Sequence, residues 1–502
     1  MAATGLPGSR GSLTDPGLVL PRRRRGKDID TAMNHQHHTH EPETDRPDGR
    51  RSRSRWWAAG LAGVAGLALT AVGVAAAPAA GSAGGATSAE TQPGDGHRGK
   101  GQPGRPSYEE KSKGDEERGR KGQGKTEKPK GTSVPCDADA LIAAITLGNA
   151  RGGAVLDLAK DCTYLLTADV GDGAGLPAIT SPITLNGGKN TVIERAAAVE
   201  QFRILTVEAD GDLTLNHLKI TGGQTDGSGG GVLVNAGGAL TTNHSIITRN
   251  IVQDDGEGGG IANLGVTQIN HSKVNWNTTS EEGGGIFSTG RLEIVKSHLD
   301  NNTGDQGGGI YQSGSTVTVK GGSISGNQAS DGGGFYLVGG SGKLTGTKVA
   351  KNTASGDGGG AVVAEAGQLT LQKVGLLDNS ALSGAAGGLF VEDPEIGSTY
   401  AVVEDSLIKN NTAADFGGGI DNSGVTVLRR TQVIGNQADQ GGGIYNTGTL
   451  RLFTTKVVKN IAITLGGGIF NSAGTVELNT ATGTVVVKNR PNNCVDVPGC
   501  AG

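Results

Sequence analysis

The chain has 502 residues, of which 90 are glycine, only 3% are aromatic and 34% are hydrophobic. This composition excludes a set of ordinary close-packed globules and favours a repetitive fold. The formal net charge of −4 gives no field that would attract nucleic acid, so no nucleic-acid partner is predicted.

Three segments precede the folded part. Residues 1–55 are polar and basic, which predicts a disordered tail, and either Met1 or Met33 is the start. Residues 56–80 hold a charge-free apolar stretch that follows arginines and ends in small residues, as a signal peptide does. Residues 81–134 are rich in Gly, Pro, Lys and Glu, which predicts a disordered charged linker.

The apolar stretch 56–77 is also long enough to span a bilayer. An uncleaved signal anchor is therefore the alternative to cleavage near Ala77–Ala80, and it would be the chain's only contact with a membrane. The protein is expected to be secreted or at the cell surface, or else anchored by this single transmembrane segment with the folded part outside.

From Gly229 onward, glycine clusters recur at intervals of mostly 24 to 26 residues. Five to eight residues after each of nine asparagines comes such a cluster, and an aliphatic residue stands three positions before each of these asparagines. The asparagines of this repeat are Asn250, Asn277, Asn302, Asn327, Asn352, Asn379, Asn411, Asn436 and Asn460.

A repeat of this length holds three short strands and cannot bury its own apolar face, whereas stacked copies can. The sequence therefore predicts an all-β, single-stranded, right-handed parallel β-helix over 154–490, a solenoid like that of pectate lyases. Like residues would stack, with Ile286 between Ile261 and Ile310 and the asparagines in a hydrogen-bonded ladder.

The ends differ from the repeat. Residues 135–153 contain an amphipathic stretch from Asp137 to Asn149 that predicts a short capping helix. The four cysteines lie in two pairs, which predicts disulfides Cys136–Cys162 and Cys494–Cys500, the second within a C-terminal loop over 491–502. A four-thiolate zinc site is disfavoured because neither pair has the two-residue spacing of zinc ligands.

The aliphatic-x-x-Asn motif followed by Gly-Gly-aliphatic resembles the repeats of chlamydial polymorphic outer membrane proteins. The segments around 136–167 and 202–223 look like exported actinobacterial β-helix proteins. The phenylalanine of the chlamydial motif is replaced throughout by Ile, Val or Leu, and the chain ends at Gly502 with no C-terminal barrel sequence. The resemblance covers roughly residues 135–500 and implies an adhesin-like surface role, although a fold does not fix a function.

An aromatic stripe is the first candidate binding surface. The residue after the inward aliphatic residue is often aromatic, and strand alternation turns it outward. These residues are Phe287, Tyr311, Tyr336, Phe390, Tyr445 and Phe470. Asp421 holds the same position in its coil, which is taken to mean that the position faces solvent. Such a stripe would suit a glycan or a protein ligand, and the alternative is that the rings pack on one another.

Acidic residues precede the glycines in most coils, and stacked carboxylates suit Ca²⁺. The candidate ligands are Asp305, Asp331 and Asp357, and solvated turn residues are the competing interpretation. No other cofactor is predicted. His217, His244, His271 and His298 fall at one place in the early coils, where a structural role is favoured over a functional one.

We therefore expect a non-catalytic extracytoplasmic rod for surface binding, adhesion or structure. The alternative is a lyase or glycoside hydrolase acting on polysaccharides, since many such enzymes use this fold. The Gly-His-Gly, Arg-Ile-Lys and Arg-x-Pro-x-x-Arg motifs of pectin-degrading enzymes are missing, so no catalytic residue is assigned.

Overall fold

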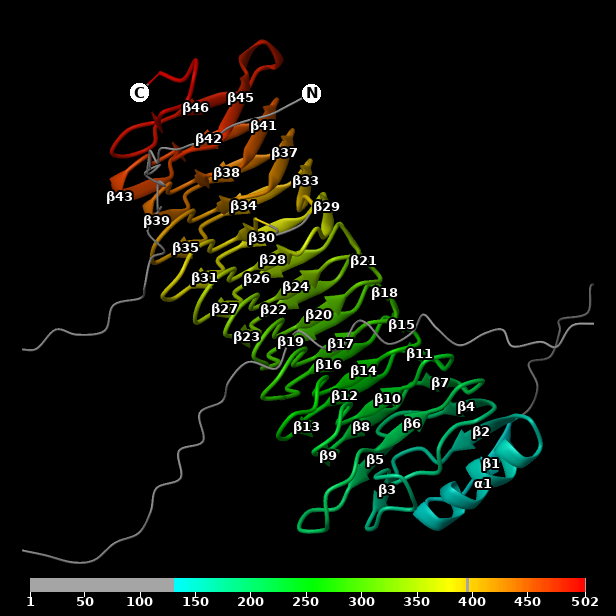
Figure 1. Ribbon diagram of the computed structural model, residues 1–502. Helices are drawn as coiled ribbons and strands as arrows, with labels where there is room; N and C mark the ends of the chain where they lie inside the picture. The colour runs from blue at the N-terminus through cyan, green and yellow to red at the C-terminus, as the bar shows by residue number, and fades with distance from the viewer. Residues whose placement is uncertain (1–130, 394–396, 502) are drawn as a thin grey trace, which may run out of the picture. The chain divides into compact units, whose positions relative to one another are not determined.

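A computed structural model describes residues 131–393 and 397–501, and these form a parallel β-helix (Figure 1). The tail and signal segments predicted for residues 1–55 and 56–80 lie outside the described residues, as does most of the predicted linker. The linker prediction is wrong at its end, because Thr132–Val134 already form a strand of the β-helix. Within the described part, no helix is long and apolar enough to cross a membrane.

From β4 onward, each coil contributes one strand to each of three long sheets, and every pairing between neighbouring coils in these sheets is parallel. The first sheet has 14 strands: β1 (Thr132–Val134), β2 (Ala154–Leu158), β4 (Pro182–Asn186), β7 (Asp212–Asn216), β11 (Ala239–Asn243), β15 (Val266–Asn270), β18 (Arg291–Val295), β21 (Thr316–Lys320), β25 (Ser341–Thr345), β29 (Gln368–Gln372), β33 (Tyr400–Glu404), β37 (Val425–Arg429), β41 (Thr449–Phe453) and β45 (Thr475–Asn479).

The second sheet has 13 strands: β3 (Thr163–Leu166), β5 (Val192–Arg195), β8 (Lys219–Thr221), β12 (Ile246–Thr248), β16 (Lys273–Asn275), β19 (His298–Asp300), β22 (Ser323–Ser325), β26 (Lys348–Ala350), β30 (Gly375–Leu377), β34 (Leu407–Lys409), β38 (Gln432–Ile434), β42 (Lys456–Val458) and β46 (Val485–Val487).

The third sheet has 12 strands: β6 (Leu205–Val207), β10 (Val232–Val234), β14 (Ile261–Asn263), β17 (Ile286–Ser288), β20 (Ile310–Ser313), β24 (Phe335–Val338), β28 (Ala361–Ala364), β32 (Leu389–Val391), β36 (Ile420–Asn422), β40 (Ile444–Asn446), β44 (Ile469–Asn471) and β47 (Cys494–Val495).

Two small sheets lie between the second and third. One pairs β9 (Gln224–Thr225) with β13 (Ile251–Val252), and the other holds β23 (Gln328–Ala329), β27 (Thr353–Ala354), β31 (Ser380–Ala381), β35 (Thr412–Ala413), β39 (Gln437–Gln440) and β43 (Ile461–Leu465). A 3-10 turn follows β45, at Thr480–Thr482.

The register puts identical positions of successive coils above one another, as predicted. Ile261, Ile286 and Ile310 are consecutive partners in the third sheet, and all three are fully buried. Alternate residues of the strands in all three sheets point into one continuous aliphatic interior. Burial of these side chains stabilises only a stack of coils, because a single coil has no neighbour against which it can bury its apolar side chains.

The predicted asparagines form a continuous column of buried side chains at one corner. Asn302 is typical: its Oδ1 accepts from the backbone N–H and the Nδ2 of Asn277, at 3.0 Å each, and its own Nδ2 donates to Val274 O at 3.0 Å. The same three bonds recur from coil to coil. Each amide therefore satisfies backbone groups that the corner would leave unpaired.

The glycine clusters close the turn beside this column. Gly283 adopts φ +71°, and a Cβ on Gly285 would lie 2.5 Å from the carbonyl oxygen of Gly309 in the next coil. Only glycine fits both the left-handed backbone and this close approach.

Both ends carry the predicted closures. At one end, α1 (Ala138–Ala150) covers the first coils, and the side chain of Asp137 caps it by accepting from Ala140 N at 2.8 Å. Leu141 and Ile145 of this helix are fully buried. The disulfides Cys136–Cys162 and Cys494–Cys500 are both formed, the first beside α1 and the second between the last third-sheet strand, β47, and the residues that follow it.

Candidate functional site

The six predicted aromatic residues lie in one column on the outer side of the third sheet, which we call the outer column. Its members are consecutive strand partners from β17 to β44: Phe287, Tyr311, Tyr336, Val362, Phe390, Asp421, Tyr445 and Phe470. The order of coils along the rod, from green to red in Figure 1, is the order of this column.

The rings form two separate stacks. Phe287 and Tyr311 are 5.7 Å apart between ring centroids, and Tyr311 and Tyr336 are 5.6 Å apart. In the second stack, Tyr445 lies 5.3 Å from Phe470. Because the rings lie over one another, each is half-buried, and inside each stack the ring edges rather than the faces point outward.

One member of the second stack was missed by sequence analysis. Phe416, which comes directly before a glycine triple, places its ring 4.6 Å from that of Tyr445. It lies in the turn and not in the strand, so it is out of phase with the stripe. The signal in the sequence was an aromatic residue directly before Gly417, the first glycine of a triple.

The two tyrosines lie among carboxylates. Burial, and then the charges of Glu282 and Glu365, raise the pKa of Tyr311. Burial, and then the charges of Glu392 and Asp331, raise the pKa of Tyr336. Neither phenol hydroxyl makes a hydrogen bond to another described residue, so both hydroxyls keep their hydrogen-bonding capacity for a ligand or water.

The carboxylates come from two different turns. Glu282 precedes the glycine triple of its coil, and desolvation, helped by Glu257, raises its pKa. Glu392 follows β32, and desolvation, helped by Glu365, raises its pKa as well. Crowded acids of this kind favour protonation or a bound cation. Glu365 and Glu392 were not predicted, although acids directly after third-sheet strands were visible in the sequence.

Asp421 interrupts the outer column between Phe390 and Tyr445. Its side chain is only 5% exposed, and among the described residues its Oδ1 has no hydrogen-bond partner. Burial, with a smaller contribution from the charge of Asp357, raises its pKa to about 7. Such a carboxyl group is poised to exchange a proton near neutral pH.

The inference that Asp421 marks a solvent-facing position was wrong. The glycine turn of each coil folds back against the outer column: a Cβ on Gly332 would lie 2.8 Å from the Tyr336 ring, and one on Gly466 would lie 2.6 Å from Phe470 Cβ. Strand alternation gave the outward direction of these side chains, but it could not reveal that the turn covers them.

The three predicted calcium ligands accept hydrogen bonds from neighbouring coils. Asp305 accepts from Ser330 Oγ at 2.5 Å, Asp331 from Asp357 N at 2.6 Å, and Asp357 from Ala385 N at 2.6 Å. Among residues 131–393 and 397–501, no three His, Cys, Asp or Glu side chains are arranged to hold a metal ion. The geometry gives these acids a role in the turns and adds nothing to the calcium hypothesis.

The grouping of four histidines was wrong in one member. His217, His244 and His271 stack, with ring centroids 4.8 and 5.1 Å apart. His298 instead belongs to β19, where it pairs with Lys273, and its Nδ1 lies 2.8 Å from Ser323 Oγ. The sequence spacing was similar, but His298 stands two positions later in its coil than the other three.

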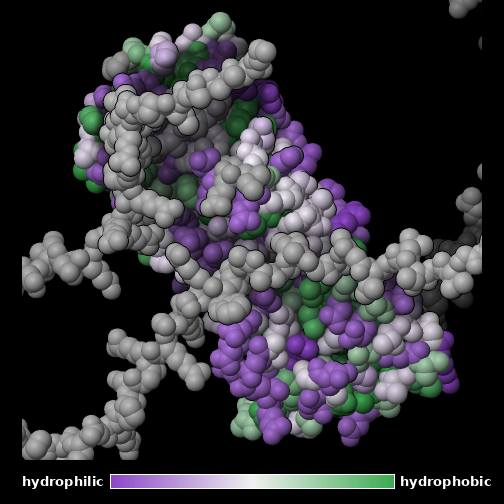
Figure 2. Space-filling model, viewed as in Figure 1, coloured by the Kyte–Doolittle hydropathy of each residue, from purple (hydrophilic) through white to green (hydrophobic). Residues whose placement is uncertain are grey.

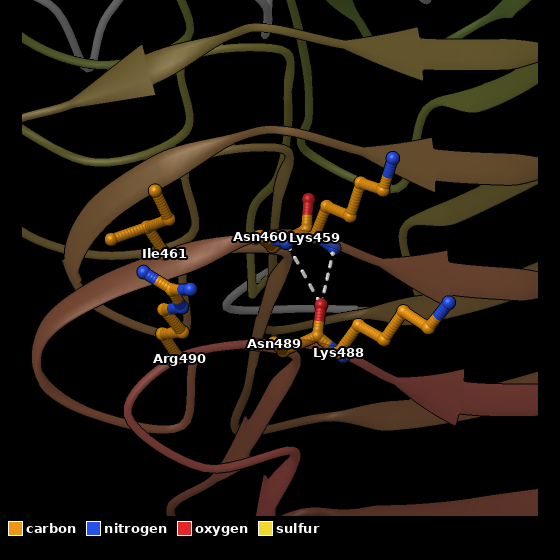
Figure 3. Close-up of a pocket in the computed structure, with 6 residues that line it drawn as sticks. All are labelled: Lys459, Asn460, Ile461, Lys488, Asn489 and Arg490. Atoms are coloured by element: carbon orange, nitrogen blue, oxygen red, sulfur yellow. Dashed lines mark hydrogen bonds between the residues drawn. The ribbon is translucent and has the colours of Figure 1, made fainter.

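The asparagine column extends one coil further than predicted. Asn489 Oδ1 accepts from Asn460 N at 2.9 Å and from Asn460 Nδ2 at 3.0 Å (Figure 3). Val486 stands three residues before it, so the motif was present, but no glycine triple follows.

In Figure 3, Lys459 and Lys488 lie on one side of a pocket of about 550 Å³, and Ile461 and Arg490 lie on the other.

A second buried polar column was also missed. Asn422, Asn446 and Asn471 face inward from the third sheet. Asn422 Nδ2 donates to Asn446 Oδ1, and Asn446 Nδ2 donates to Asn471 Oδ1, at 2.7 Å each. The signal in the sequence was an asparagine two residues after the inward isoleucine.

The visible surface of the rod is mainly hydrophilic, with small scattered apolar patches (Figure 2).

Comparison with known proteins gives no identification. Neither a protein-family model, nor a curated protein, nor a solved structure matches this chain.

Proposed function

We propose that this chain is an extracytoplasmic β-helix rod that binds a surface ligand along the outer column without catalysis. The observation that carries the proposal is the pairing of the half-buried ring stack Phe287–Tyr311–Tyr336 with crowded carboxylates that have raised pKa values. A regular solenoid needs neither feature for its stability, since the interior and the asparagine column hold the coils together. The two disulfides support an oxidising compartment.

The surroundings favour a glycan that carries ammonium groups over a neutral one. Carboxylates that repel each other are stabilised by a cationic partner, and the two free tyrosine hydroxyls offer hydrogen bonds to sugar hydroxyls. A rigid row of such groups suits a polymer whose units repeat along the rod. A basic protein segment is the second candidate ligand, because it also carries positive charge. An adhesin-like role, as the resemblance to polymorphic outer membrane proteins implies, would use the same face.

The test is a glycan array probed with the full chain, in which chitosan oligosaccharides are compared with the N-acetylated oligosaccharides of the same length. We expect stronger binding of the cationic series. Changing Tyr311→Ala together with Tyr336→Ala should abolish binding. Tyr400→Ala is the matched control, since Tyr400 is 43% exposed and lies on the first sheet, and it should bind as the unchanged protein does.

A polysaccharide-active enzyme is the second candidate, and Asp421 is the observation that favours it. A buried carboxyl group with a pKa near 7 has the property of a general acid. Reducing-sugar and unsaturated-uronide assays on every array hit separate the two functions. Binding without turnover supports the rod, whereas turnover that Asp421→Asn abolishes would establish the enzyme instead.

A further inference from the structure

A second surface, with the opposite charge, lies at the turns that join the first sheet to the second in the coils nearest α1. We call it the imidazole corner. It contains a pocket of about 680 Å³. The residues that line the pocket are Lys160, Gly187, Gly188, Lys189, Asn190, Thr191, Val192, His217, Leu218, Lys219, His244 and Ile246. Three lysines and two histidines are therefore present, and no aspartate or glutamate lines the pocket.

The stacked histidines follow from the backbone of this corner. His217, His244 and His271 each adopt the left-handed conformation, with φ of 53°, 51° and 50°. Histidine is one of the residues that tolerate it. Because the backbone repeats, the side chains leave the corner in the same direction and the imidazoles stack. Their spacing of 4.8 and 5.1 Å is that of neighbouring coils.

Two glycines pack this turn against Lys160 and against the next coil. A Cβ on Gly188 would lie 2.6 Å from Lys160 Cγ, so the alkyl chain of Lys160 lies directly over this turn. A Cβ on Gly187 would lie 2.6 Å from His217 O, so the turn also packs tightly on the next coil. The close contacts of Gly187 and Gly188 thus fix this turn, although Lys160 and Lys189 are exposed residues.

Asp161, the residue after Lys160, has a carboxylate that is already engaged, since its Oδ1 accepts from Asn190 Nδ2 at 2.8 Å. Positive charge also continues past the pocket. Lys296 takes the corner position in the coil after His271, and it too has a positive φ of 46°. Lys273 lies two residues after His271, on β16. The corner therefore carries basic or imidazole groups in each of six successive coils.

We propose that the imidazole corner binds a polymer that carries phosphate or sulfate groups. Lysine ammonium groups and imidazole N–H groups are donors to such oxyanions, and no carboxylate in the pocket competes for them. Donors repeated about every 4.8 Å along the rod suit a chain of anions better than a single ion. This inference is independent of the proposed function, because it concerns another sheet, another charge and another ligand.

The experiment measures the affinity of the full chain for linear polyphosphate and for heparin, with orthophosphate and poly-glutamate as comparison ligands. Residues 1–130 hold many arginines and lysines, so a constant background of polyanion binding is expected. The variant Lys160→Ala/Lys189→Ala/Lys219→Ala removes the three pocket lysines. We expect its dissociation constant for the better polymer to rise about tenfold.

The matched control is Lys348→Ala/Lys409→Ala/Lys456→Ala, which removes the same charge from exposed positions of the second sheet in distant coils. It should change the affinity less than twofold, because these lysines contribute only background attraction. His217→Asn with His244→Asn, which keeps residues that tolerate the left-handed backbone, should weaken binding about threefold.

Stronger binding of polyphosphate would identify a phosphate polymer as the source of the anions, and stronger binding of heparin would identify a sulfated glycan. Equal losses in the pocket and control variants would overturn the proposal, because binding would then follow net charge alone. Poly-glutamate binding as tightly as both polymers would also overturn it.

Discussion

The asparagine column and the outer column are built by the same stacking of coils, yet they differ in chemistry. In the asparagine column every position from Asn250 to Asn489 is the same residue, buried and hydrogen-bonded to the neighbouring coil. In the outer column the residue changes from coil to coil, ring stacks end and begin again, and one buried carboxyl oxygen has no described partner. Uniformity therefore marks what the fold requires, and variation within a column marks positions that are free to serve a ligand.

The largest expected effect is a loss of stability when the asparagine column is interrupted. Asn302→Ala removes the acceptor for two donors of Asn277 and the donor to Val274 O, all buried. We expect the free energy of unfolding to fall by about 4 kcal/mol, because several backbone and amide groups lose their partners at once. Denaturant-induced unfolding followed by circular dichroism measures this loss.

Asn301→Gly is the control for this change. Asn301 is the exposed neighbour of Asn302 with φ 56°, a conformation that glycine adopts freely. We expect a change below about 0.5 kcal/mol. Equal losses in the two variants would contradict the assignment of the column as the element that holds the coils in register.

The second effect is the pH dependence of stability that Asp421 in the outer column causes. Because the pKa of Asp421 is raised to about 7 in the folded chain, folding binds a proton between the unfolded pKa near 3.8 and pH 7. Stability must therefore fall as the pH rises through this window and stay low above it. Asp421→Val installs the residue that the equivalent Val362 position already carries and cannot ionise.

We expect the stability advantage of Asp421→Val over the unchanged chain to be larger at pH 8 than at pH 4 by roughly 3 kcal/mol. Asp415→Ala, which removes an exposed acid from the preceding turn, should show a much smaller difference. Thermal or denaturant unfolding at both pH values measures these differences. An advantage of Asp421→Val that is independent of pH would show that the carboxyl group is not held protonated in the fold.

The smallest effect on stability separates binding from folding. Tyr311→Phe keeps the ring stack and removes a hydroxyl that bonds no described residue, so the free energy of unfolding should change by less than about 0.5 kcal/mol. Its affinity for the best array ligand should nevertheless fall about fivefold, since one hydrogen bond is lost. Calorimetry on Tyr311→Phe and Tyr400→Phe measures both quantities, and equal affinity in the two variants would contradict a role for the Tyr311 hydroxyl.

The period of the sequence was enough to predict the fold, because every coil obeys the same stacking constraint. Ile261, Ile286 and Ile310 could be aligned from spacing alone, and so could the asparagines. The burial of Asp421 could not be predicted from the sequence, because it depends on a turn that folds back over the strand. The carboxylates around Tyr336 come from turns on both sides of the strand, and their proximity arises only in three dimensions.

Hydrogen–deuterium exchange of the full chain, with and without the best-binding oligosaccharide from the array, tests the binding role of the outer column most directly. The account predicts slower exchange at 281–290, 305–313 and 331–338 when the ligand is bound, and unchanged exchange at 215–221 and 242–248 in the imidazole corner. Protection that spares the outer column, or that lies only on the first or second sheet, would contradict it.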